Sequence, residues 1–114
     1  MVTADDVRAL ASTLPRAYEV LVRDRVKFRV GRIVFLSLSP DETVLGFGYP
    51  RLERAALVAG EPHKFHLPIE SDLRYNWVRV WLAEIDLDEL RELVLDSWRM
   101  VVPKKVWTAY LATH

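Results

Sequence analysis

The stretch that decides the fold reads Arg23-Asp24-Arg25-Val26-Lys27-Phe28-Arg29-Val30, followed by Gly31-Arg32 and the apolar run Ile33 to Leu38. Basic and apolar side chains alternate in its first half, which predicts a β-strand over 23–30 with the cations on one face. Gly31-Arg32 is typical of a turn. The run 33–38 is apolar at successive positions, as in a strand covered on both faces. These patterns predict two antiparallel neighbours in a sheet.

Periodicity and capping signals extend this sheet in both directions along the chain. They predict a helix from Thr3 to Leu14, a strand over 44–49, a helix over 50–60, a long connection over 61–74 with one extended segment near Phe65, a strand over 76–82, a long helix from Asp86 to Val101 and a last helix after Pro103. The expected fold is therefore α+β, a single-layer antiparallel sheet of about five strands backed by helices. The predicted order is α-β-β-β-α-β-β-α-α, in one domain over 1–114.

Composition narrows the classes of protein that this chain can represent. Its 114 residues are 51% hydrophobic and 28% charged, as in an average globular domain, and no apolar run approaches the length of a membrane span. The N-terminus lacks the basic region of an export signal, so we expect a cytoplasmic protein. The absence of cysteine excludes disulfides, thiolate metal sites and cysteine nucleophiles.

Several motifs in order resemble the MmcQ/YjbR family of small bacterial proteins. They are Phe28 to Phe35, the stretch Arg74-Tyr75-Asn76-Trp77-Val78-Arg79-Val80, Asp86 to Leu93, Asp96 to Arg99 and Pro103-Lys104-Lys105. The resemblance implies a YjbR-like fold of the secretion-chaperone type. It also implies DNA binding, a label that members carry by structural analogy, and it brings no catalytic residues. The segment Phe65 to Asp72 departs from the basic segment that many members have there.

The formal net charge is zero, but the charges are unevenly placed along the chain. Cations gather between Arg23 and Arg32, whereas 84–96 is mostly acidic. Side chains two apart on a strand project about 7 Å apart, close to the phosphate spacing of an extended nucleic acid. The alternative is an ordinary solvated edge strand whose charges prevent aggregation. The candidate nucleic-acid-binding residues are Arg23, Arg25, Lys27 and Arg29, with Lys104 and Lys105 at the start of the last helix.

Two further features leave alternatives open. Trp77, Arg79 and Trp81 share one strand face, where they would form a platform for bases or else lie in the core beneath Trp98 and Trp107. Gly46 and Gly48 leave space on one sheet face for those indoles or for a ligand.

We expect a binding module without catalytic activity, cofactor or metal, whose ligand is DNA or RNA. The alternatives are a protein- or peptide-interaction domain resembling secretion chaperones, and a small-ligand or enzymatic pocket near Gly46, Gly48 and His66. His63 and His66 lack the third ligand of a metal site.

Overall fold

Tight turns set the register of the first three strands. In the computed structural model, which describes residues 1–114, β1 (Ala17–Val22) and β2 (Arg25–Val30) form a hairpin with Val22 opposite Arg25. Arg23 and Asp24 form its two-residue turn with φ angles of 48° and 66°. Positive φ at both positions is what the type I′ hairpin turn requires. The strand expected over 23–30 therefore begins at Arg25, and Arg23 lies in the turn.

The sheet has six antiparallel strands, one more than the sequence predicts, because β1 was not foreseen. After β3 (Ile33–Leu38) the chain forms β4 (Val44–Gly48), β5 (Phe65–His66) and β6 (Trp77–Trp81). The strand order is β1-β2-β3-β4-β6-β5, so β6 lies beside β4 in the interior of the sheet. The α+β class and the helix-backed antiparallel sheet are confirmed.

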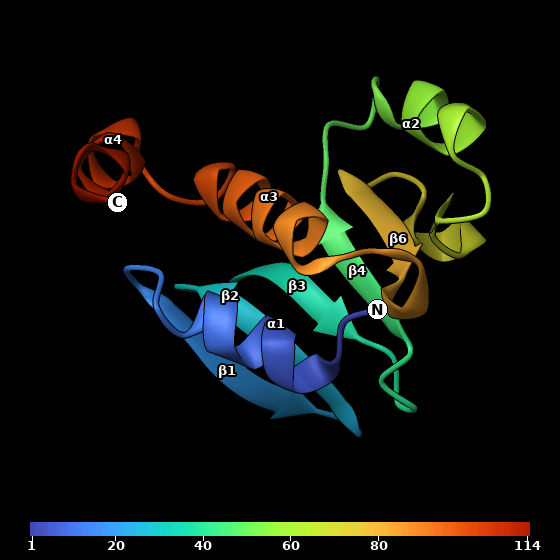
Figure 1. Cartoon of the computed structure of the whole chain (residues 1–114), viewed down its shortest axis with the longest axis horizontal. Helices are drawn as coiled ribbons and strands as arrows, with labels where there is room; N and C mark the ends of the chain where they lie inside the picture. The colour runs from blue at the N-terminus through green and yellow to red at the C-terminus, as the bar shows by residue number, and fades with distance from the viewer.

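Helices α1 (Ala4–Ala11) and α3 (Leu87–Arg99) pack on the same face of the sheet (Figure 1). Both begin at side-chain caps, Thr3 with Asp6 in α1 and Asp86 with the backbone N–H of Glu89 in α3. The core lies between these helices and the sheet, and its largest member is Trp98, which is fully buried and donates its indole N–H to the Pro15 carbonyl at 2.9 Å.

Two helices lie outside this layer. Helix α2 (Arg54–Gly60) follows β4, and α4 (Lys104–Thr113) extends beyond the end of α3 (Figure 1). The guanidinium of Arg99 lies 4.0 Å from the ring centre of Trp107 and so joins α4 to α3. No helix of the structure is long and apolar enough to span a membrane.

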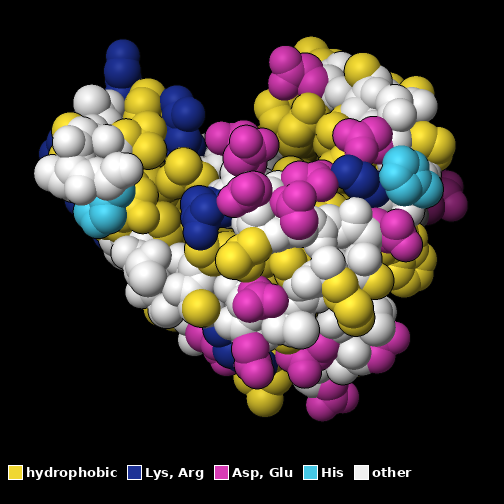
Figure 2. All heavy atoms as spheres, viewed as in Figure 1, with side chains coloured by type: hydrophobic (Ala, Val, Ile, Leu, Met, Phe, Trp, Pro, Cys, Tyr) yellow, Lys and Arg dark blue, Asp and Glu magenta, His cyan; other side chains and the backbone are white.

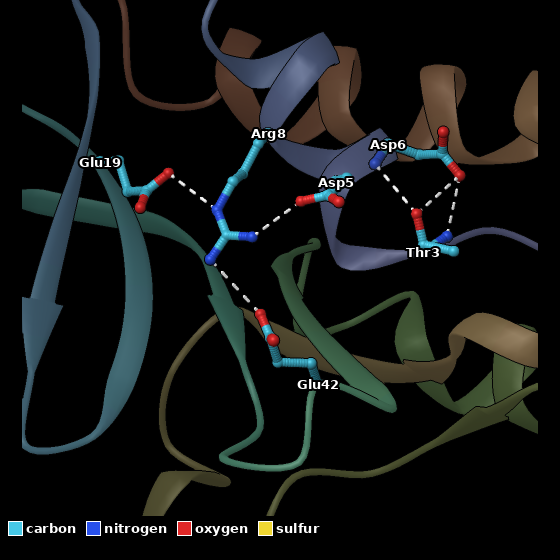
Figure 3. Close-up of polar contacts among 6 residues, drawn as sticks. All are labelled: Thr3, Asp5, Asp6, Arg8, Glu19 and Glu42. Atoms are coloured by element: carbon cyan, nitrogen blue, oxygen red, sulfur yellow. Dashed lines mark hydrogen bonds and ion pairs between the residues drawn. The ribbon is translucent and has the colours of Figure 1, made fainter.

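Arg8 fastens the helical layer to the strands through three carboxylates (Figure 3). Its guanidinium lies 3.1 Å from Asp5 in α1, 3.2 Å from Glu19 in β1 and 3.4 Å from Glu42 in the turn after β3. On this side of the sheet the cation is therefore already neutralised by the protein's own acids.

Candidate functional site

We call the face of the sheet opposite α1 and α3 the open face; the end of α3 and the segment leading into β6 border it. Register pairings place a row of residues across five strands of this face: Lys27 in β2, Ser37 in β3, Gly46 in β4, Arg79 in β6 and His66 in β5. Adjacent strands are about 4.8 Å apart, so the backbones of Lys27 and Arg79 are about 14 Å apart. The row thus brings basic side chains from separate strands to one surface.

A groove of about 850 Å³ follows the open face. Its floor includes Ser37, Gly46 and Gly48, and its wall on the β6 side is formed by Trp77 and Arg79. Four cations line it, Arg25, Lys27, Arg32 and Arg79, against the single carboxylate of Asp72. Four positive charges and one negative charge give the groove a formal charge of +3, in a protein whose net charge is zero.

The two glycines of β4 have separate packing roles. A Cβ atom at Gly46 would lie 2.7 Å from Nε1 of Trp77, so the missing side chain makes room for that indole. At Gly48 the nearest atoms belong to Met100 and Ser97 at the end of α3, and the Ser97 hydroxyl donates to the Gly48 carbonyl at 2.8 Å. The glycines therefore accommodate protein side chains, one of which, Trp77, forms the wall of the groove.

His66 and Arg79 form a polar pair beside this wall. Nε of Arg79 donates to Nε2 of His66 at 3.0 Å, which requires an unprotonated acceptor nitrogen. Burial, together with the positive charge of Arg79, lowers the pKa of His66 below its ordinary value. The imidazole lies 5.2 Å from the ring centre of Trp81, which is 44% exposed. A neutral histidine thus holds the Arg79 guanidinium in place beside two tryptophans.

The ion pairs of the protein do not involve the cations of the groove. All six ion pairs use only three cations, Arg8, Lys64 and Arg91. On the helical side, Asp and Glu side chains gather over α1 and α3 (Figure 2). By contrast, no cation that lines the groove has a carboxylate within 4.0 Å. The basic groups of the groove are free to meet an external anion.

The structure brings some of the predicted site residues together and separates others. Arg25 and Lys27 line the groove. Arg29 shares their strand face and is half-buried, with Nε shielded from solvent and without a hydrogen-bond partner. Arg23 is exposed in the β1–β2 turn, and Lys104 and Lys105 are exposed in the first turn of α4, away from the groove lining.

The side chains of Trp77 and Trp81 in β6 lie on the open face. The alternative that places them in the core beneath Trp98 is therefore wrong. Trp77 is half-buried along the groove and Trp81 is exposed, whereas Trp98 is buried on the helical side. In β6 it is Val78 and Val80, both fully buried, that face the core.

Sequence reasoning did not foresee the role of Arg54, which is only 9% exposed. Its guanidinium donates to the carbonyl oxygens of Leu73, Tyr75 and Trp77, and so fixes the segment leading into β6 to helix α2. Its position at the start of a helix gave no indication of burial. The helix expected over 50–60 begins at Arg54, so Leu52, which is 93% exposed, lies before it.

No group of three or more histidine, aspartate or glutamate side chains in the structure is arranged to hold a metal ion.

Known proteins match this chain both in sequence and in structure. A family model described as YjbR matches residues 12–100. Uncharacterised proteins of Mycobacterium tuberculosis and Mycobacterium bovis are 40% identical over 57 residues, which is 50% of this chain and 43% of each relative's length. A Deinococcus radiodurans protein with a DUF419 domain, known from its crystal structure, superposes with a TM-score of 0.78 at 20% identity, over 96% of this chain and 88% of its own.

Proposed function

The chain belongs to the YjbR family, and for this member we propose that the open face binds single-stranded nucleic acid and carries out no reaction on it. The observation that carries the proposal is the set of groove cations without carboxylate partners, beside Trp77 and the exposed Trp81. A positively charged groove with aromatic rings for bases is the usual design of proteins that bind single strands.

The arrangement supports contacts to the phosphate backbone from several strands. Arg25 and Lys27 approach the groove from β2, and Arg79 approaches it from β6, about 14 Å away across the sheet. A ligand that crosses the sheet meets cations at both ends of this span. Because none of these cations forms an ion pair with a carboxylate of the chain, binding does not first have to break one.

The shape favours single strands over a duplex. The major groove of a duplex is about 12 Å wide, and a protein reads it by inserting a protruding helix or two-stranded ribbon. This site is instead recessed on a sheet and walled by an indole. An unpaired base can enter it and stack on Trp77, and such stacking is worth about 1–3 kcal/mol per base.

The polar pair beside the groove supports binding over catalysis. The His66 nitrogen that would serve as a base already accepts a hydrogen bond from Arg79. Ser97, the buried serine near the groove, donates its hydroxyl hydrogen toward the carbonyls of Gly48 and Leu93 rather than toward a histidine. These groups act as fixed structural elements of the surface.

The test is the salt dependence of binding to a fluorescent oligothymidylate of about 15 nucleotides, near the upper range of such sites. Each phosphate contact to a single strand contributes about −0.7 to the slope of log K against log salt, so four cations predict a slope near −3. The double variant Arg25→Ala/Lys27→Ala is expected to reduce the slope by about 1.4.

The matched control is Lys104→Ala/Lys105→Ala, which removes the same charge from α4, outside the groove lining. It should leave the slope nearly unchanged. Equal losses in the two double variants would show that binding follows total charge and not the groove. No binding at low salt, or tighter binding of an acidic peptide than of the oligonucleotide, would refute the proposal in favour of a protein-interaction domain.

A further inference from the structure

The two edges of the sheet differ in how they are protected against pairing with another strand. At one edge β5 has two residues, and prolines at 62 and 68 lie close to its ends. At the other edge β1 has six residues and no proline or lysine. No element covers its outer side (Figure 1). Proteins usually blunt such edges with short strands, proline or lysine, and β1 has none of these devices.

The side chains of β1 are also unusually apolar for an outer strand. The strand reads Ala17-Tyr18-Glu19-Val20-Leu21-Val22. Leu21 is 70% exposed and Tyr18 is 44% exposed. Its only charged residue, Glu19, is paired with Arg8 of the same chain at 3.2 Å. The edge therefore has little charge of its own with which to repel a second strand.

The hairpin determines which backbone groups of β1 remain free. Val22 and Arg25 flank the two-residue turn, so they form a hydrogen-bonded pair, and such pairs alternate with non-bonded ones along the ladder. The N–H and C=O groups of Val20 consequently point toward β2. Those of Glu19 and Leu21 point outward, where no strand meets them.

We infer that β1 is a self-association edge, on which a second copy of this chain adds its own β1 in antiparallel orientation around an axis at Val20. In this register Glu19 lies opposite Leu21 of the partner, and the outward N–H and C=O groups of these two residues hydrogen-bond to each other across the interface. On the open face Val20 lies opposite its own copy, and Tyr18 lies opposite the partner's Val22. The neighbouring register that pairs Glu19 with its own copy brings like charges together, which disfavours it.

Charge does not oppose this arrangement. Two β1 strands would lie between the two β2 strands, so the cations of one copy would be three strand spacings, or about 14 Å, from those of the other. That distance exceeds the Debye length of about 8 Å at physiological ionic strength. The result is one continuous sheet with two basic grooves on the same face.

An interface made by one six-residue edge is small, so the dimer should be weak and dependent on concentration.

The inference is independent of the proposed function, because it is tested without nucleic acid. Sedimentation from low micromolar up to about 1 mM protein should show a monomer–dimer equilibrium. Leu21→Lys should raise the dimer dissociation constant at least tenfold, because lysine at an edge blocks pairing. Leu52→Lys, at a site outside the edge that is 93% exposed, should leave it unchanged, with circular dichroism confirming that both variants fold.

A second test uses the lack of native cysteine. In the inferred register the two Val20 Cα atoms form a non-hydrogen-bonded pair about 4.5 Å apart, within the range that a disulfide spans. Val20→Cys should therefore form a covalent dimer under mild oxidation much faster than the control Leu52→Cys. A protein that stays monomeric at every concentration, or equal cross-linking rates in the two variants, would overturn the inference.

Discussion

Arg54 offers a prediction whose magnitude follows from its contacts. It is a buried guanidinium without a carboxylate partner, and its charge is satisfied by the carbonyls of Leu73, Tyr75 and Trp77. The substitution Arg54→Met keeps an unbranched apolar stem but removes the guanidinium, which leaves three acceptors without their donor. Each unsatisfied buried acceptor costs about 1–3 kcal/mol.

Two effects set the size of the loss. Water can reach carbonyls near the surface, which favours the lower end of that range, about 3 kcal/mol for three groups. The substitution also removes a buried charge that has no carboxylate partner, and this offsets part of the destabilisation. We therefore expect Arg54→Met to lower the free energy of unfolding by about 2 kcal/mol. Arg54→Lys should lose about half as much, because an ammonium cannot reproduce the planar fork that reaches several carbonyls.

The assay is urea unfolding followed by circular dichroism, with the free energies taken at equal m-values. The control is Arg51→Met, because Arg51 is exposed and its guanidinium donates to one carbonyl, that of Arg74, at 2.7 Å. It should cost less than about 0.5 kcal/mol. The reasoning is refuted if Arg54→Met is no less stable than Arg51→Met, or if Arg54→Lys is as stable as the wild type.

Three further predictions address the site and the face opposite. Gly46→Ala would place a Cβ atom 2.7 Å from Nε1 of Trp77, so it should displace the indole, shift the tryptophan fluorescence, weaken oligonucleotide binding about tenfold and cost about 1–3 kcal/mol of stability through overpacking. Unchanged fluorescence would contradict it. The lowered pKa of His66 means that the unfolded chain binds more protons below the ordinary value of 6.5, so stability should fall as pH drops below 6.5 and stay level above it. His66→Gln, which still accepts from Arg79, should flatten this decline in urea midpoints, and an identical pH profile would count against the explanation. Arg8→Met should cost about 1 kcal/mol in low salt and almost nothing in 1 M salt, since its ion pairs are largely exposed; a loss that salt does not change would point to packing.

Residue periodicity predicted most of the sheet correctly. Its strands either alternate polar and apolar residues or are short continuous apolar runs, and neither pattern has the 3.6-residue period of a helix. It missed β1 for a specific reason. Arg23 continues the alternating basic residues of β2, and neither Arg23 nor Asp24 is the glycine or asparagine that usually marks a turn with positive φ. The alternation therefore predicts strand where the turn lies, and Arg23 does not share the strand face of Arg25 and Lys27.

The groove depends on strand order, which the sequence does not encode locally. Lys27 and Arg79 are far apart in the chain, and they share a surface only because β6 inserts beside β4. The alternation in β6 correctly grouped Trp77 with Arg79 and Trp81. It did not decide which side of the strand faces the core, because valines and tryptophans are both apolar enough to be buried.

The most direct test of the open face as the binding surface uses the indole N–H signals of the protein in a ¹⁵N-resolved NMR titration with a single-stranded oligonucleotide. Two reporters, Trp77 and Trp81, lie on the open face, whereas Trp98 is buried against Pro15 and Trp107 lies in α4 under Arg99. We expect the signals of Trp77 and Trp81 to shift together with the amides of Lys27, Ser37 and Arg79, while those of Trp98 and Trp107 stay in place. Shifts confined to Trp107 and the helical side, with Trp77 and Trp81 unmoved at saturation, would contradict the account.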